Sequence, residues 1–180
     1  MNSVNEFKSY MLSLNVNEEL TNFLLDMLEG ENSLQSLIVK IEILQSEGIN
    51  INALTEGLME NPFFVIEEPK VIEHNIEVLK KYIDKKELTK VLEMNIDYLT
   101  IPDDHFEQNI KMVKLLVSPD IFEILLKANG EIFTFNSDHL EKRFEFFIKN
   151  GFKTRLEELI MGRIDLFELD EDEINLEELY

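Results

Sequence analysis

The sequence contains no cysteine, and its 180 residues include only three histidines. The lack of cysteine excludes disulfides, thiolate catalysis and metal sites built on thiolates. No apolar run approaches the roughly 20 residues that are needed to cross a bilayer. Residues 1–6 also lack the basic start and apolar centre of a secretory signal. We therefore expect a cytoplasmic protein that has no membrane segment.

Basic residues are scarce as well, with 17 against 37 acidic ones and a formal net charge of −20. Such a field repels phosphate backbones and attracts basic protein surfaces. A high net charge also keeps a protein soluble, and this role of the acidic residues requires no dedicated partner. The acids are most concentrated after residue 164, where no base occurs. That stretch contains Asp165, Glu168, Asp170, Glu171, Asp172, Glu173, Glu177 and Glu178.

A period of 34 residues runs through most of the chain. Similar segments begin at Asn61, Asn95, Asn129 and Arg163. Apolar residues recur at the same period, and we call each set of residues spaced 34 positions apart a column. We predict that the columns form the core and that Leu99, Leu126, Phe133 and Phe144 are buried. The columns are Phe64, Tyr98, Ile132 and Leu166; Val65, Leu99, Phe133 and Phe167; Ile72, Phe106, Leu140 and Ile174; Ile76, Ile110 and Phe144; Leu79, Val113 and Phe147; Leu54, Leu88, Phe122 and Leu156; and Leu58, Leu92, Leu126 and Ile160.

One unit of this repeat predicts two helices and a short turn. Apolar residues at steps of three and four indicate a helix over residues 103–117. Ser118 and Pro119 are typical of the start of a second helix, which Asn129 and Gly130 would end by adopting left-handed conformations. Residues 131–135 are too few for a stable α-helix and fit a single turn.

These patterns predict an all-α fold, a solenoid of 34-residue units, within a single domain. Two amphipathic helices over residues 2–14 and 17–29 precede the clear repeats, and we interpret them as a cap on the end of the array. The predicted segments are 1–180 as one domain, 1–32 as the N-terminal helical cap, 33–169 as the tandem repeats and 170–180 as an acidic C-terminal helix or tail.

The unit resembles the repeat of the mitochondrial transcription termination factor family. The matching parts are the segment 61–65, helices over Val71–Ile83 and Lys86–Met94, and their copies, so that the resemblance covers roughly Ile38 to Leu169. The resemblance implies a helical solenoid that binds nucleic acid through a basic groove. The residues available for such binding are Lys80, Lys81, Lys85, Lys86 and Lys90.

Motifs for catalysis, cofactors and metals are lacking. The sequence has no glycine-rich phosphate loop, no nucleophile elbow and no His-Glu-x-x-His pair. His105 and His139 lie 34 residues apart, which favours repeated helix-start residues over a metal pair, and His74 stands alone. The run from Asp170 to Glu173 lacks the glycine and the spacing of a calcium loop. We expect no catalytic residue, no cofactor and no metal site.

The sequence therefore predicts a non-enzymatic interaction module. Its partner would be a protein with a basic surface that handles nucleic acid. The acidic protein would occupy that surface and inhibit the partner, as a nucleic-acid mimic or an anti-defence inhibitor does. The eight acids after residue 164 are the predicted contact residues. The alternative is a nucleic-acid-binding regulator that uses the lysines between Lys80 and Lys90, although the net charge argues against direct nucleic-acid binding.

Overall fold

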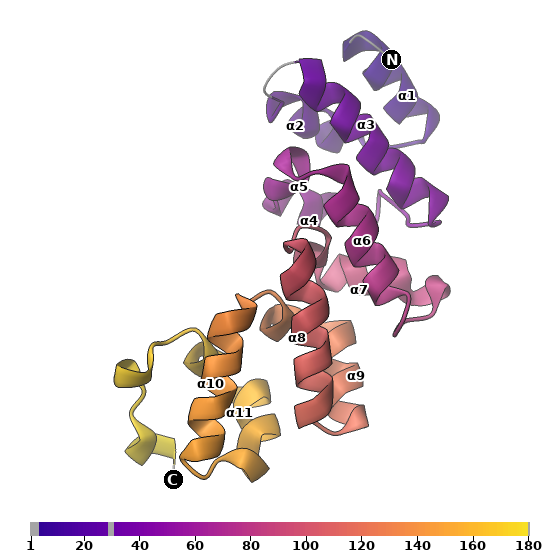
Figure 1. Ribbon diagram of the computed structural model, residues 1–180. Coiled ribbons are helices and arrows are strands. Elements are labelled where there is room, and N and C mark those ends of the chain that lie inside the picture. Colours follow the sequence, from indigo (N-terminus) through magenta and orange to yellow (C-terminus); the bar gives the residue numbers. More distant parts are fainter. Residues whose placement is uncertain (1–3, 29–30, 180) are drawn as a thin grey trace. The chain divides into compact units, whose positions relative to one another are not determined.

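Every regular element in the described part of the chain, residues 4–28 and 31–179, is helical in the computed structural model. The chain divides into two compact units, Met1–Asp103 and Asp104–Tyr180. The first contains α1 to α7 and the second most of α8, followed by α9 to α11 (Figure 1). The all-α prediction is confirmed. The division into cap, repeats and tail, and the single domain, stay predictions.

The first unit begins with two short helices, α1 (Val4–Ser13) and α2 (Glu18–Asp26), where the sequence predicted them. Residues 2, 3 and 29 of the predicted helices lie outside the described residues. The Asn17 side chain caps α2 by accepting a hydrogen bond from the backbone N–H of Glu19. Each helix buries a narrow stripe of side chains, such as Phe7 and Met11 on α1.

The rest of the first unit is built around two long helices that pack against each other. These are α3 (Glu31–Ser46) and α6 (Pro69–Leu79). Shorter elements fill the intervening chain and complete the unit. They are α4 (Thr55–Glu60), α5 (Phe63–Ile66), η1 (Lys85–Glu87), α7 (Leu88–Met94) and η2 (Ile96–Leu99), where η denotes a 3-10 helix.

The second unit repeats the alternation of helix, helix and short turn. Its elements are α8 (Asp103–Leu116), α9 (Pro119–Ala128), η3 (Gly130–Phe133), α10 (Ser137–Lys149), η4 (Lys153–Arg155), α11 (Leu156–Gly162), η5 (Ile164–Phe167), η6 (Glu171–Glu173) and η7 (Leu176–Leu179). The predicted helix over 103–117 is confirmed as α8, and the turn predicted over 131–135 is found one to two residues earlier, as η3.

The ends of α9 differ from the prediction. The Ser118 side chain makes no capping hydrogen bond, and the backbone N–H of Ser118 instead donates to the Glu157 carboxylate. Asn129 has φ −146°, and Gly130 is not among the described residues with positive φ. The helix therefore ends without a left-handed residue, because Asn129 extends the chain directly into η3.

The apolar columns form the core. Leu99 and Phe133 are fully buried, and Leu126 and Phe144 are each 2% exposed. Every other member of the columns is buried too, with the largest exposure at Phe122 and Ile174. Burial of these side chains is the main stabilising contribution to both units. The predicted core is confirmed residue by residue.

A buried polar side chain sits in the apolar stripe of each long helix. Lys40 on α3 donates to the carbonyls of Phe64 and Val65, and Asn75 on α6 donates to Ile101 O at 2.7 Å. In the second unit, Asn109 donates to Phe133 O at 3.1 Å and Phe135 O at 2.7 Å, and Arg143 donates to Leu169 O. We call these four residues the carbonyl clamps. Each satisfies backbone acceptors in or just after a short turn, which would otherwise lack partners in the interior.

The clamp Lys40 is fully buried, and burial lowers the pKa of its ammonium to about 8, while nearby Glu67 opposes the change. Above this pH the folded chain releases the proton, whereas the unfolded chain keeps it until about pH 10.5. The unfolded state then binds more protons, so stability rises with pH over this window. Between pH 7.5 and 9.5 we expect Lys40 to add about 2 kcal/mol to the free energy of unfolding.

Urea melts of wild type and Lys40→Met across this pH range measure that contribution, because the variant cannot release the proton. Lys142→Met removes an exposed lysine and serves as the control. The free energy of unfolding should rise with pH more in wild type and in Lys142→Met than in Lys40→Met. Parallel curves for all three proteins would contradict a buried, titrating Lys40.

Over its described residues, 170–179, the acidic segment that was predicted as a C-terminal helix or tail forms two 3-10 turns, η6 and η7. Asp170 and Glu173 form a capping box around η6, and Ile174 is extended. Ile174 and Leu179 are buried, and Arg155 donates to Leu179 O. Helix formation is opposed by the consecutive acids, which repel one another. In addition, the residue 34 positions after Arg143 is Glu177, whose carboxylate cannot donate as a clamp does.

Candidate functional site

The eight predicted contact acids are all exposed on the second unit. Some of them are engaged within the chain. Asp165 pairs with Arg163 at 3.0 Å, and this hydrogen-bonded contact holds the pKa of Asp165 below its usual value. Asp170 and Glu173 cap η6 through each other's backbone. Asp165, Asp170 and Glu173 therefore stabilise local turns. The role of the tail in binding stays a prediction.

The lysines of the predicted alternative site lie at the end of α6 and around η1 in the first unit. The Lys80 and Lys85 ammonium groups are 3.1 and 3.3 Å from the same Glu47 carboxylate oxygen, and Lys80 also pairs with Glu77 at 2.7 Å. Hydrogen bonding by Lys80 and Lys85 lowers the pKa of Glu47. Lys81, Lys86 and Lys90 are exposed. The charges of Lys80 and Lys85 are thus partly offset by carboxylates of the chain itself.

The two repeated histidines make separate structural contacts. His105 Nδ1 lies 2.8 Å from Ser137 Oγ, and His139 Nε2 lies 2.9 Å from the carbonyl of Phe167. Both side chains therefore connect the start of a long helix to the next turn or helix. Among the described residues, no three histidines or carboxylates gather in a way that could hold a metal ion.

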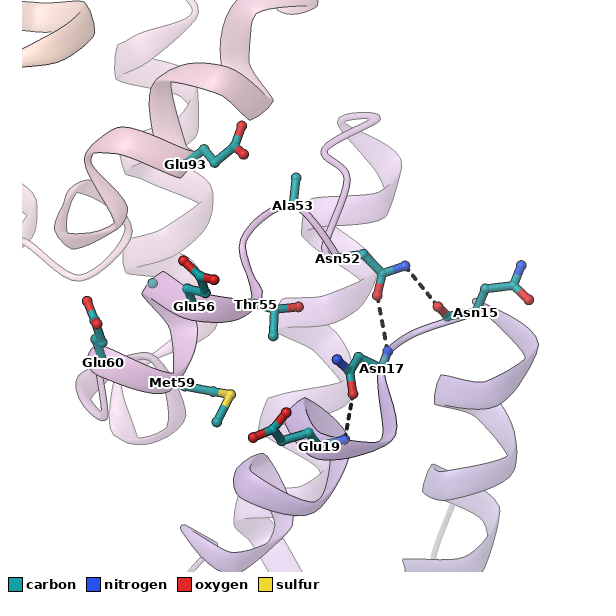
Figure 2. Close-up of a pocket in the computed structure, with 11 residues that line it drawn as sticks. Asn15, Asn17, Glu19, Asn52, Ala53, Thr55, Glu56, Met59, Glu60 and Glu93 are labelled. Carbon is teal, nitrogen blue, oxygen red and sulfur yellow. Dashed lines mark hydrogen bonds between the residues drawn. The ribbon is translucent and has the colours of Figure 1, made fainter.

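Sequence reasoning missed a cleft in the first unit, with a volume of about 890 Å³. Its charged lining consists of carboxylates from three helices and contains no base: Glu19 on α2, Glu56 and Glu60 on α4, and Glu93 on α7 (Figure 2). All four are exposed to solvent. We call this feature the acidic cleft. The rest of its lining is polar or small, apart from Met59: Asn15, Asn17, Asn52, Ala53, Thr55, Gly57 and Met59.

Asparagine side chains fix one wall of the acidic cleft. Asn52 accepts from the backbone N–H of Asn17 at 3.1 Å and donates to the carbonyl of Asn15 at 2.8 Å, as Figure 2 shows. Asn15 itself has φ +55°, a conformation that asparagine tolerates better than most residues. These bonds tie the turn between α1 and α2 to the loop before α4.

The opposite wall depends on a glycine. A Cβ atom at Gly57 would lie 2.9 Å from Ile96 Cβ, so only glycine lets α4 approach η2 this closely. The wall that carries Glu56 and Glu60 is consequently packed closely against η2. The cleft is thus a concave surface of a single charge sign on a firmly held backbone, suited to binding cationic side chains.

No signal in the sequence marked these four glutamates. They come from three separate stretches of the chain, around residue 19, residues 56–60 and residue 93, and each resembles many other solvated acids on helix surfaces. Only the packing of α2, α4 and α7 brings them around one cleft.

Comparison with known proteins adds no identification, since no family model, curated protein or solved structure matches the chain. Within residues 4–28 and 31–179, no helix has the length and apolar character needed to cross a bilayer.

Proposed function

We propose that this chain is a non-enzymatic interaction module that binds a basic segment of a partner protein in its acidic cleft. The observation that carries this proposal is the concave lining of four glutamates with no base among the lining residues. A basic segment would be attracted by the −20 net charge and then held where carboxylates surround it. The asparagine bonds around Asn52 keep the wall in place before binding, which lowers the entropic cost of association.

The proposed architecture is a repeat array. Its support is that η2, η3 and η5 begin at Ile96, Gly130 and Ile164, which are 34 residues apart, and that the carbonyl clamps recur at spacings of 34 or 35. Repeat proteins commonly offer extended surfaces to macromolecules. This architecture therefore agrees with a binding role.

The proposed partner is a protein that handles nucleic acid. Such a protein exposes a surface rich in lysine and arginine to hold phosphates. An acidic protein that covers this surface would compete with the nucleic acid and act as an inhibitor. The alternative, direct binding of nucleic acid through Lys80 to Lys90, has less support because Glu47 and Glu77 already pair with Lys80.

The cleft is tested by replacing Glu19, Glu56, Glu60 and Glu93 together with glutamine. Affinity for a synthetic peptide of alternating lysine and serine should fall about tenfold at low ionic strength, since each of the four lost charge pairs contributes about 0.3–0.4 kcal/mol. Fluorescence anisotropy with the labelled peptide measures the change. High salt should weaken wild-type binding and reduce the difference between the proteins.

A matched control removes the same charge from the tail, with Asp170 and Asp172 changed to asparagine and Glu171 and Glu173 to glutamine. We expect a smaller loss for this control, mainly in the association rate. If both variants lose affinity equally, binding depends on net charge and not on the cleft. A gel shift with duplex DNA, expected to be negative, tests the alternative function.

A further inference from the structure

The short helix α5 exposes two large apolar side chains. Phe63 is 60% exposed and Ile66 is 68% exposed, whereas Phe64 and Val65 between them are buried. Residues three positions apart in a helix lie on the same face. Phe63 and Ile66 therefore form an apolar pair on the outer face of α5, which we call the α5 anchor.

The fold does not require apolar residues at these places, as the chain's own copies show. The position of Phe63 is occupied by Asp97, Glu131 and Asp165 in the later segments, and that of Ile66 by Thr100, Thr134 and Glu168. The three acids are exposed, and the residues at the Ile66 position are polar in every later copy. Solubility favours polar residues at such sites. The fold alone therefore does not explain why positions 63 and 66 carry large apolar side chains.

The backbone beneath the α5 anchor is held from two sides. On one side, Lys40 donates to the carbonyls of Phe64 and Val65. On the other, the buried Asn61 donates to Asp97 and Thr100 at 2.9 and 3.0 Å. A preorganised apolar pair loses little conformational entropy on binding, which is the property of an efficient interface residue.

Negative charge predominates near the pair. Residues 55–70 contain four glutamates, at positions 56, 60, 67 and 68, and one base, Lys70, which pairs with Glu68 at 2.8 Å. Glu56 and Glu60 also line the acidic cleft. Only two residues separate Glu60 in the cleft wall from Phe63 in the anchor, so their Cα atoms are at most about 11 Å apart. About two turns of a partner α-helix would cover this distance.

We propose that the α5 anchor binds an apolar stripe on the same partner segment whose basic side chains enter the acidic cleft. The partner segment is then an amphipathic basic helix. This inference rests on the proposed function and specifies the chemistry of its partner. The charge pattern selects this occupant over a second copy of the chain, because two molecules of net charge −20 repel each other.

The experiment uses two synthetic peptides of about 18 residues, or five helical turns. One is an amphipathic helix of lysine and leucine, and the other has each leucine replaced by glutamine at the same charge. The protein variant is Phe63→Gln with Ile66→Thr, which leaves the net charge unchanged and introduces at position 66 the residue found at Thr100 and Thr134. Leu115→Thr removes an exposed apolar residue of the second unit and is the control.

Wild type should bind the lysine–leucine peptide about tenfold more tightly than the lysine–glutamine peptide, the effect of a moderate interface contact. The Phe63→Gln, Ile66→Thr variant should lose this preference and still bind the lysine–glutamine peptide like wild type, and Leu115→Thr should behave as wild type. Equal binding of both peptides by wild type would overturn the anchor and leave the proposed function standing. Failure to bind either peptide would overturn both.

Sedimentation of the protein alone at rising concentration tests the competing occupant. We expect a monomer for wild type and for the double variant. Self-association of wild type that the double variant abolishes would assign the anchor to a second copy and overturn the partner helix.

Discussion

Replacing Phe133 with alanine should lower the free energy of unfolding by about 3–5 kcal/mol, the usual loss for a buried aromatic side chain. Phe133 is fully buried in η3 and meets Phe122 edge to face, with ring centroids 6.2 Å apart. Alanine would leave a cavity between α9 and the turn, and it would also remove this ring contact. The loss is large because a close-packed interior relaxes only partly around a cavity.

Urea denaturation followed by circular dichroism measures this effect. Phe63→Ala deletes the same side chain from an exposed site on α5 and is the matched control, for which we expect a loss below about 1 kcal/mol. A small loss for Phe133→Ala, similar to that of the control, would contradict its place in the core.

The helices and the core could be predicted because hydrophobic periodicity reports burial directly. Phe106, Ile110 and Val113 recur at steps of three and four, and all three are fully buried on α8. Burial of such side chains dominates folding energetics, so the pattern that predicts them also predicts the helix that carries them.

The carbonyl clamps escaped prediction because their role depends on tertiary contacts. Asn75 and Asn109 interrupt apolar stripes, and a polar residue in such a place can equally well face solvent. The recurrence of a donor at Lys40, Asn75, Asn109 and Arg143 was the available signal. Its meaning becomes clear only when the carbonyls of the short turns are seen opposite each side chain.

The candidate surfaces could not be predicted for a different reason. With 37 acids in the sequence, Glu19 and Glu93 have no feature that distinguishes them from other solvated carboxylates. The α5 anchor did have a signal, since Phe63 aligns with acids in the later copies. Apolar runs such as 63–66 do not reveal which side chains point outward, because a short helix and a buried strand read alike.

Changing Asn109 to aspartate should destabilise the second unit by about 3–5 kcal/mol at neutral pH, the scale of a buried charge without a partner. Asn109 is fully buried, and its amide nitrogen donates to Phe133 O and Phe135 O. Aspartate has the same shape but presents oxygen to both carbonyls, so two attractive contacts become repulsive and a carboxylate is buried. The change tests the clamp without altering the volume of the core.

The penalty should grow as pH rises from 5 to 8. In the interior the carboxyl group of the variant favours its neutral form, whereas in the unfolded chain it ionises freely, so the unfolded state binds fewer protons and stability falls with rising pH. Urea melts at both pH values measure this effect.

Asn75→Asp should behave similarly in the first unit, because Asn75 is also fully buried and donates to Ile101 O. Asn5→Asp, at an exposed position on α1, should be nearly neutral. A loss below about 1 kcal/mol for Asn109→Asp, independent of pH, would mean that water reaches this amide and that the turn is not held by the clamp.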